Sequence, residues 1–198
     1  MQIYSFGALS SVELTRLYEW SPSVTSRINV VVDATGSMRG VDGSSQSLTS
    51  QHDRKILHVI RAGADAVIVG AQSVRTEGWH IPQNALLAVV TNKGFEALPP
   101  CPHPDSVVTG PLVQILEELN STHHWVAEGG QSVIEQLLAL KKIDQLCISF
   151  RHTAQHETVQ TPELPGWLVA ASPSPFTCVF IIRDEDMLFT LWRRGAEA

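Results

Sequence analysis

Residues 125–150, WVAEGGQSVIEQLLALKKIDQLCISF, contain the pattern that decides the fold. An apolar run at 124–127 predicts a short buried strand, and the segment 143–150 predicts a second one. Between them, apolar residues recur at helical spacing over 131–141, which predicts a helix with one buried face. A strand, a helix and a strand in this order form the unit from which parallel sheets are built. The stretch therefore predicts an α/β fold.

The same alternation runs through the chain up to about residue 150. Strands are predicted at 28–33, 65–69, 86–91 and 106–109, and helices at 11–20, 50–63, 71–76 and 111–120. The tail differs, because 176–183 and 187–193 are two apolar strands around Asp184-Glu185-Asp186, which is typical of a hairpin. We expect a three-layer α/β fold, with a mostly parallel sheet and a C-terminal antiparallel hairpin.

The composition favours one folded domain over residues 1–198, with its core at 27–195. The 198 residues are 43% hydrophobic and 17% charged, which is enough for an ordinary packed core. A formal net charge of −6 argues against a nucleic-acid partner. No run approaches the ~18 apolar residues of a membrane span, and the first 20 residues do not resemble a signal peptide. We therefore expect a cytoplasmic protein without a membrane partner.

The three cysteines, Cys101, Cys147 and Cys178, have no metal-binding spacing. An odd number of cysteines scattered through apolar segments is typical of buried thiols in a reducing compartment. We expect no metal centre.

Small or polar residues follow three of the predicted strands, at Gly70-Ala-Gln-Ser73, Thr109-Gly110 and Glu128-Gly-Gly-Gln-Ser132. Ligands of parallel sheets bind at the carboxyl ends of the strands. Glycines before a helix let the backbone approach a ligand, and the helix N-terminus offers N–H groups to an anion such as a pyrophosphate. The competing interpretation is that Gly129-Gly130 only forms a tight turn.

Four polar residues have two interpretations each. Glu128 follows an apolar strand, so its carboxylate binds a ligand or caps the next helix. Arg61 lies late in its helix, where it reaches a substrate phosphate or stabilises the helix C-terminus. Asp33 and Thr35 stand where a strand enters a Gly/Ser-rich loop at 34–47, and they face a substrate or form a turn.

Two stretches together resemble the pyrimidine-reductase family of riboflavin biosynthesis, the reductase half of a bifunctional deaminase–reductase. They are RAGADAVIVGAQSVR at 61–75 and EGGQSVIEQLLALKKIDQLCIS at 128–149. The resemblance implies a dihydrofolate-reductase-like fold, NADPH as cofactor and a homodimer. It implies a small-molecule substrate, 5-amino-6-(5-phosphoribosylamino)uracil, whose ribosyl group is reduced to ribityl by hydride transfer.

The resemblance and the strand ends together imply roles for single residues. The expected cofactor contacts are Val31, Gly70, Ser73, Thr109, Gly110, Gly129, Gly130, Gln131, Ser132 and Val133. The expected substrate contacts are Thr35, Ser45, Thr49, Arg61 and Glu128. Asp33 and Glu128 are the candidate catalytic groups, and we expect no indispensable acid–base residue, because water or the substrate can deliver the proton.

The chain departs from the family pattern at three places. Thr35 stands where the family has an acid, and Ser47-Leu48-Thr49 replaces Trp-Ile-Ser. Glu77-Gly78-Trp79-His80 replaces an Asp-Asp-Pro motif, and the family's phosphate-binding arginine is missing after it. Two alternatives therefore stay open: an NADPH-dependent reductase of another heterocycle, such as dihydrofolate, and a non-catalytic nucleotide-binding module.

Overall fold

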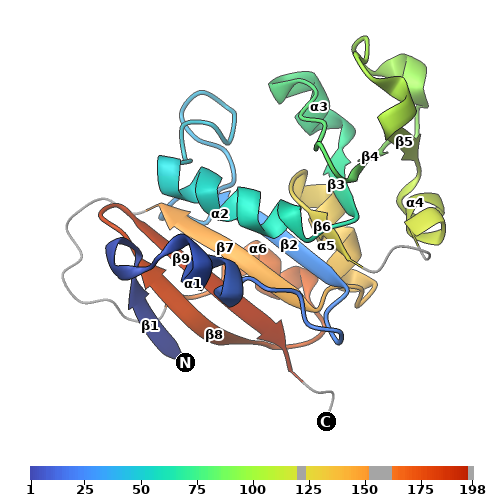
Figure 1. The fold of residues 1–198 in the computed structure, drawn as a ribbon. Coiled ribbons are helices and arrows are strands. Elements are labelled where there is room, and N and C mark those ends of the chain that lie inside the picture. The colour runs from blue at the N-terminus through green and yellow to red at the C-terminus, as the bar shows by residue number, and fades with distance from the viewer. Residues whose placement is uncertain (120–123, 152–161, 196–198) are drawn as a thin grey trace.

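In the computed structural model, which describes residues 1–119, 124–151 and 162–195, nine strands join one sheet (Figure 1). Their order is β1-β8-β9-β7-β2-β6-β3-β4-β5. The strands are β1 (Gln2–Ser5), β2 (Ser26–Val32), β3 (Ala66–Gly70), β4 (Leu86–Val90), β5 (Val107–Gly110), β6 (Trp125–Ala127), β7 (Gln145–Arg151), β8 (Phe176–Arg183) and β9 (Met187–Arg194).

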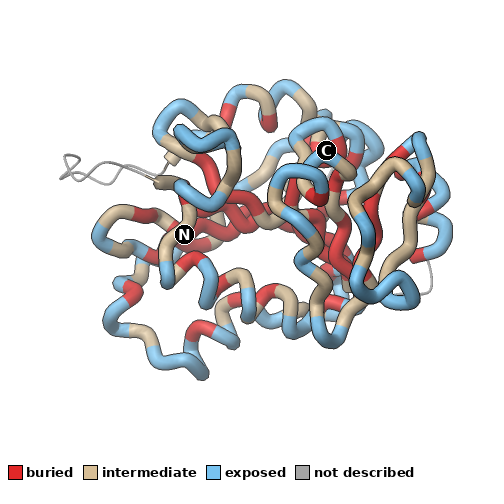
Figure 2. Tube along the Cα trace, turned by 90° about the horizontal axis from the view of Figure 1, so that it is seen from above, coloured by how far each residue is buried: buried red, intermediate tan, exposed pale blue. Residues whose placement is uncertain are grey.

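Two layers of helices cover the two faces of this sheet. The helices are α1 (Ser11–Leu17), α2 (Gln51–Ala62), α3 (Ala71–Glu77), α4 (Leu112–Glu118), α5 (Gln131–Ala139) and α6 (Gly166–Ala171). Side chains of α4, α5 and α6 pack with Ile28, Val30 and Val32 of β2 in one core cluster. Side chains of α1, α2 and α3 pack with Val31 in the other, because successive residues of a strand face opposite sides. Figure 2 shows the buried residues concentrated in the middle of the molecule.

The six strands from β7 to β5 in the sheet order are all parallel to one another. Their carboxyl ends therefore lie along one edge of the sheet, which we call the carboxyl edge. β9 pairs antiparallel with both β7 and β8. β1 is the last strand on that side of the sheet and pairs parallel with β8. The predicted three-layer α/β fold with a mostly parallel sheet and a C-terminal antiparallel hairpin is confirmed.

Helix starts follow the local sequence. Ser10 caps α1 and forms a reciprocal capping box with Glu13. Ser50 caps α2, where its hydroxyl accepts the backbone N–H of Asp53. The helix predicted from Pro111 begins one residue later, since Pro111 is its cap, and its predicted end at residue 120 lies outside the described residues.

Two elements are absent from the sequence prediction. β1 has four residues and is mostly exposed, so it shows no apolar run, and only pairing with β8 makes it a strand. α6 has six residues and one buried anchor, Leu168, which is too short a pattern to reveal its period. In the described part of the chain, no helix has the length and apolar character that crossing a bilayer requires.

Candidate functional site

Two adjoining cavities lie at the carboxyl edge. The α2 cavity, of about 450 Å³, is bordered by β2, α2 and the loop at 33–50. The α5 cavity, of about 250 Å³, is bordered by the same loop, α3 and the start of α5. Four residues line both cavities and separate them: Met38, Ser45, Glu77 and Glu128. The carboxyl edge is therefore hollowed in two adjoining parts, as expected for a parallel sheet.

Arg61 and Glu128 form an ion pair on the wall of the α2 cavity. The Arg61 Nε donates to Glu128 Oε1 at 2.7 Å, and Nη2 donates to Oε2. The side chain of Glu128 is 8% exposed and that of Arg61 is 25% exposed. Burial by itself lowers the pKa of Arg61, but the hydrogen bonds and charge of Glu128 raise it above its ordinary value. The guanidinium therefore keeps its charge beside the carboxylate.

The fold brings this pair together from distant parts of the chain. β6 lies between β2 and β3, so the residue after it, Glu128, stands in the middle of the carboxyl edge. Its backbone N–H donates to the carbonyl of Ile68 at 3.0 Å. Arg61 reaches it from the last turn of α2. The cap of α5 is Gly130, so Glu128 does not cap that helix, and the ligand-facing interpretation of Glu128 gains support.

The Gly129-Gly130 turn faces the α5 cavity at the start of α5. Gly130 has φ +75°, a conformation that favours glycine. A Cβ on Gly130 would stand 3.4 Å from the Cα of Gly70, and one on Gly129 would stand 3.0 Å from the Oγ of Ser73. The glycines thus let the ends of β3 and β6 approach closely and leave the backbone of the turn open to the cavity.

The expected cofactor residues divide into three groups. Ser73, Gly129, Gly130 and Gln131 line the α5 cavity, whereas Val31 lines the α2 cavity. The others line neither cavity: Gly70, Thr109, Gly110, Ser132 and Val133. Thr109 and Gly110 end β5, the outermost strand, which β4 and β3 separate from β6. Val133 is buried beneath the glycine turn.

Asp33 and Thr35 form a local turn and line neither cavity. Asp33 Oδ1 accepts from the Thr35 hydroxyl at 2.7 Å, from the Thr35 N–H at 2.8 Å and from the Ser37 N–H at 2.9 Å. The hydrogen bond from the Thr35 side chain is the main reason why the pKa of Asp33 is lowered. The catalytic role expected of Asp33 and the substrate contact expected of Thr35 thus find no support in the geometry, since their polar groups are used in the turn.

Ser45 and Thr49, both expected as substrate contacts, lie on the 33–50 loop and line the α2 cavity. The N–H and hydroxyl of Ser45 both donate to Glu77 Oε1, at 3.0 and 2.8 Å. The Thr49 hydroxyl donates to the carbonyl of Gln46 at 3.1 Å. From the sequence, Glu77 was noted only as part of a stretch that departs from the family pattern. It ends α3 and lines both cavities, which makes it a residue of the candidate site.

Asp53 is a second residue that sequence reasoning missed. It lies in the first turn of α2, lines the α2 cavity and is 7% exposed. The Ser149 hydroxyl of β7 donates to Asp53 Oδ1 at 2.6 Å. Burial raises the pKa of the Asp53 carboxyl, and the hydrogen bond from Ser149 and the charge of Arg54 oppose that shift in part. In the sequence this acid, three residues after Ser50, has the pattern of an ordinary helix-capping acid.

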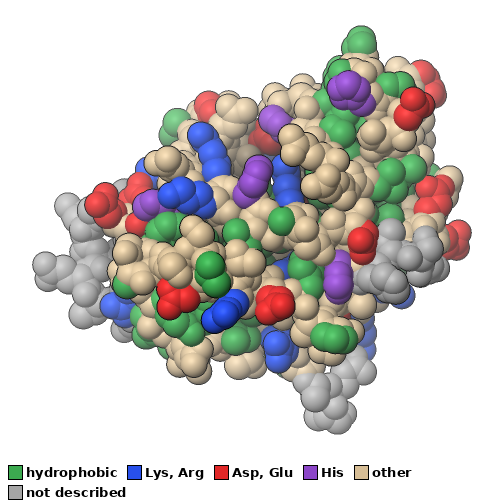
Figure 3. Space-filling model, in the orientation of Figure 1, with side chains coloured by type: hydrophobic (Ala, Val, Ile, Leu, Met, Phe, Trp, Pro, Cys, Tyr) green, Lys and Arg blue, Asp and Glu red, His purple; other side chains and the backbone are tan. Residues whose placement is uncertain are grey.

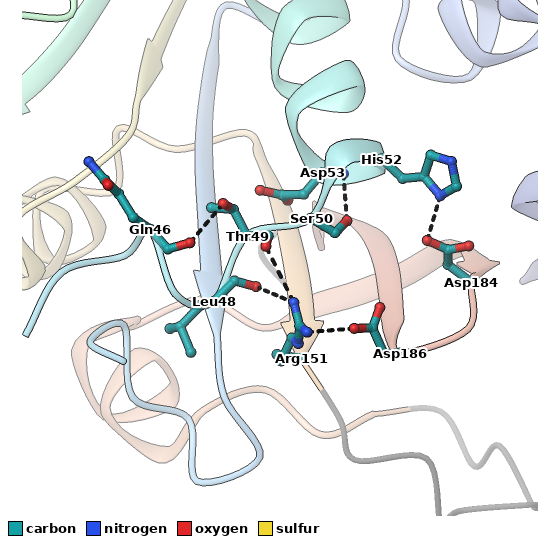
Figure 4. Close-up of polar contacts among 9 residues, drawn as sticks. All are labelled: Gln46, Leu48, Thr49, Ser50, His52, Asp53, Arg151, Asp184 and Asp186. Carbon is teal, nitrogen blue, oxygen red and sulfur yellow. Dashed lines mark hydrogen bonds and ion pairs between the residues drawn. The ribbon is translucent and has the colours of Figure 1, made fainter. Parts of the chain in front are cut away.

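A polar network fixes the N-terminus of α2 beside the cavity (Figure 4). His52 Nδ1 lies 2.7 Å from Asp184 Oδ2. Arg151 donates to the carbonyls of residues 48–49, at 3.4 and 3.3 Å, and pairs with Asp186 at 2.6 Å. The turn of the C-terminal hairpin thus anchors the segment that carries two cavity residues, Thr49 and Asp53.

The outer face of α2 is basic. Its sequence, QHDRKILHVIRA, contains two histidines, two arginines and a lysine. Figure 3 shows Lys, Arg and His side chains gathered over this helix. Of these, Arg54 and Arg61 line the α2 cavity. Basic groups favour an anionic ligand, although Arg61 is already paired with Glu128 and His52 with Asp184, and the formal net charge of the whole chain is −6.

No protein-family profile matches the chain, and no curated protein sequence matches it either. Among solved structures, the chain is similar to a pyrimidine reductase-like protein from Corynebacterium diphtheriae, with 18% identity and a TM-score of 0.64. That match covers 97% of both chains. The name of that protein agrees with the pyrimidine-reductase family that the sequence resembles.

Two further structures extend the likeness. A diaminohydroxyphosphoribosylaminopyrimidine deaminase/5-amino-6-(5-phosphoribosylamino)uracil reductase from Thermotoga maritima has 16% identity and a TM-score of 0.62, over 87% of this chain and 57% of that one. Dihydrofolate reductase from Enterococcus faecalis, complexed with NADP(H), has 13% identity and a TM-score of 0.61, over 87% of this chain and 97% of that one. At these identities the likeness establishes the fold, which is dihydrofolate-reductase-like.

Proposed function

We propose that the protein is an NADPH-dependent reductase of riboflavin biosynthesis, which reduces the ribosyl group of 5-amino-6-(5-phosphoribosylamino)uracil to ribityl. One observation carries this proposal: the Arg61–Glu128 pair is followed at once by the Gly129-Gly130 turn, on the wall between two cavities. A substrate bound by Glu128 and a cofactor anchored at the glycine turn then share this wall. Hydride transfer needs the nicotinamide end of that cofactor, rather than its pyrophosphate, to contact the substrate.

The α5 cavity suits the pyrophosphate of NADPH. The turn there has no side chains, and added Cβ atoms would crowd Gly70 and Ser73. α5 begins at this turn, so its first N–H groups and the positive end of its dipole favour an anion. The Ser73 hydroxyl and the Gln131 side chain are further hydrogen-bonding groups on the same wall. NADPH, when bound, supplies the hydride.

The α2 cavity suits a substrate with a sugar chain and a phosphate. Glu128 accepts hydrogen bonds from sugar hydroxyls, and Arg61 holds the carboxylate in place. The hydroxyls of Ser45 and Thr49 face the same cavity. Arg54, on the basic face of α2, offers the substrate phosphate a charge in place of the missing family arginine.

We also propose that the protein acts in the cytoplasm and that it is a homodimer. Static light scattering, which measures molar mass in solution, tests the homodimer.

A second candidate function is the reduction of another heterocycle, such as dihydrofolate. The acids that line the α2 cavity favour it: Asp53, Glu77 and Glu128. With Arg61 paired to Glu128, the carboxyl group of Glu77 remains beside Arg54 and His80, and a carboxylate repels a phosphate.

One assay separates these functions: NADPH oxidation, followed by absorbance, with the phosphoribosylamino-pyrimidine and with dihydrofolate in parallel. We expect turnover with the pyrimidine. Turnover with dihydrofolate alone would favour the second candidate. NADPH binding without turnover of either would indicate the non-catalytic module. No binding at ~1 mM NADPH, the upper end of usual KM values, would contradict all three.

A further inference from the structure

Arg39 is a basic residue of the α5 cavity to which the proposed function gives no role. It lies on the 33–50 loop and is exposed. It lines the same cavity as the Gly129-Gly130 turn. In the part of the chain that the structure describes, no group hydrogen-bonds or pairs with its guanidinium. The N–H donors of this guanidinium are thus available to a ligand of the cavity.

The charges around the α5 cavity create a need for a cation there. Among the described residues, Arg39 is the one basic residue that lines it, and Glu77 and Glu128 are the acids. Glu128 is paired with Arg61, so its charge is compensated. Glu77 is bound by Ser45, which is a neutral residue. A phosphate that enters the cavity is therefore repelled by Glu77 unless a cation offsets that charge.

The backbone of Arg39 is held in place, although its guanidinium is free. The Ser37 hydroxyl accepts the Arg39 N–H at 3.1 Å and donates to the Arg39 carbonyl at 3.0 Å. Ser37 is itself held by Asp33: its N–H donates to Asp33 Oδ1 at 2.9 Å, and its carbonyl accepts the Asp33 N–H at 2.9 Å. Asp33 directly follows β2. The turn at Asp33 thus connects the backbone of Arg39 to the end of a central strand.

We propose that Arg39 is a cofactor-binding residue, whose guanidinium binds the pyrophosphate of NADPH from the loop side of the α5 cavity. This rests on the proposed function, in which the pyrophosphate lies at the glycine turn. A guanidinium offers a planar pair of N–H donors to a phosphate and stays charged at any pH at which proteins are folded. Asp33 is then a positioning residue, because it acts on the cofactor through Ser37 and Arg39.

The first test compares the dissociation constants of NADPH and NADH for the wild type, Arg39→Ala and Arg39→Lys, measured by fluorescence of the reduced nicotinamide. Both variants should fold, because Arg39 is exposed. We expect Arg39→Ala to bind both dinucleotides about 10- to 100-fold more weakly, the loss typical of a hydrogen bond to a charged group. Arg39→Lys should recover part of the affinity, because it keeps the charge.

The comparison of the two dinucleotides identifies which phosphate Arg39 contacts. NADPH and NADH have the same pyrophosphate, so Arg39→Ala should weaken the binding of both by the same factor. A loss confined to NADPH would assign Arg39 to the 2′-phosphate, and unchanged affinity for both would show that Arg39 contacts neither phosphate group. Either result would overturn the proposal.

Arg16→Ala is the matched control. Arg16 is also an exposed arginine, but it lies in the last turn of α1 and lines neither cavity. Its substitution removes the same formal charge from the chain and should leave both dissociation constants unchanged. Equal losses in Arg16→Ala and Arg39→Ala would show an effect of net charge alone, and the proposal would fail.

A second pair of variants tests the positioning role of Asp33. Asp33→Ala removes the acceptor that holds Ser37, whereas Asp33→Asn keeps an oxygen at that place. We expect NADPH binding to be several-fold weaker in Asp33→Ala and close to that of the wild type in Asp33→Asn. In the background of Arg39→Ala, Asp33→Ala should cause no further loss, because the residue through which it acts has been removed. Full additivity of the two losses would contradict the positioning role.

A binding experiment with inorganic pyrophosphate separates this inference from the proposed function, because it uses neither NADPH nor substrate. We expect pyrophosphate to shift the nuclear magnetic resonance signal of the Arg39 Nε–H group, and to bind more weakly to Arg39→Ala but not to Arg16→Ala. That result in a protein that binds no NADPH would support the anion-binding role of Arg39 and contradict the proposed function. A wild type that oxidises NADPH with substrate, but shows no response to pyrophosphate at Arg39, would overturn this inference alone.

Discussion

The guanidinium of Arg61 donates to both carboxylate oxygens of Glu128 and so ties the last turn of α2 to the end of β6. Glu128 lines both cavities, and the glycine turn that opens the α5 cavity follows it directly. The ion pair therefore holds in place a segment where the proposed substrate and cofactor sites meet.

Removing Arg61 should destabilise the protein as well as the site. In Arg61→Ala the carboxylate of Glu128, with 8% of its side chain exposed, loses both hydrogen bonds. We expect the free energy of unfolding to fall by about 1–3 kcal/mol, measured by urea denaturation. The double variant Arg61→Met with Glu128→Gln removes both charges and should recover part of the loss. Equal losses in the single and double variants would contradict this account.

Gly130 should be required for NADPH binding. Gly130→Asp places a carboxylate at the proposed pyrophosphate site, and Gly130→Ala adds a Cβ 3.4 Å from Gly70. We expect no detectable binding by the first variant and weaker binding by the second, measured by NADPH fluorescence. Gly78→Ala is the control, because Gly78 also has positive φ, +85°, but a Cβ there meets no atom within 4 Å. Equal affinity of all three variants and the wild type would contradict the assigned site.

Asp53 should make stability depend on pH in a defined direction. Its pKa is raised by burial in the folded state, so the folded protein binds this proton more tightly than the unfolded chain. The contribution of this proton to the free energy of unfolding is fully present below about pH 4, the ordinary pKa of aspartate. It is lost as the pH rises through the raised pKa of Asp53 in the folded protein. Wild-type unfolding free energy should therefore fall relative to that of Asp53→Asn over this window, measured by urea denaturation. Parallel curves would contradict the prediction.

The Ser45–Glu77 contact should hold the 33–50 loop against α3. Glu77→Ala removes the acceptor of both the Ser45 N–H and the Ser45 hydroxyl, worth about 1 kcal/mol for each neutral donor. We expect faster amide hydrogen exchange at Ser45 and a higher KM for substrate. The N–H of Leu86 in β4, which lies outside the loop and donates to the carbonyl of Asp65, serves as the internal reference. Unchanged exchange at Ser45 would show that the contact does not hold the loop.

The sequence predicts those parts of the fold that local patterns determine. The apolar runs of β2, β3, β4, β6 and β7, and the helices between them, follow from periodicity alone. β1 and α6 do not, because they are short and depend on neighbours distant in the sequence. The Gly129-Gly130 turn was recognisable because two glycines before a helix are a local signal.

The residues of the site were less accessible to sequence reasoning, since a contact between chain-distant side chains leaves no local pattern. Glu128 and Arg61 were each predicted as substrate contacts and both line the α2 cavity, but their pairing depends on α2 approaching the end of β6. In the sequence Asp53 has the pattern of a helix-capping acid, and only the fold places Ser149 of β7 within hydrogen-bonding distance of it. Asp33 and Thr35 have the same sequence pattern whether they face a substrate or form a turn, and the structure selects the turn.

The most direct measurement of the central claim follows the hydride itself. The protein is incubated with the phosphoribosylamino-pyrimidine and with NADPH that carries deuterium on the transferred position of its nicotinamide. We predict a ribityl product with one deuterium on its first carbon, detected by mass spectrometry, and no labelled product with Gly130→Asp. A folded wild-type protein that binds both compounds and yields no deuterated ribityl product would contradict it.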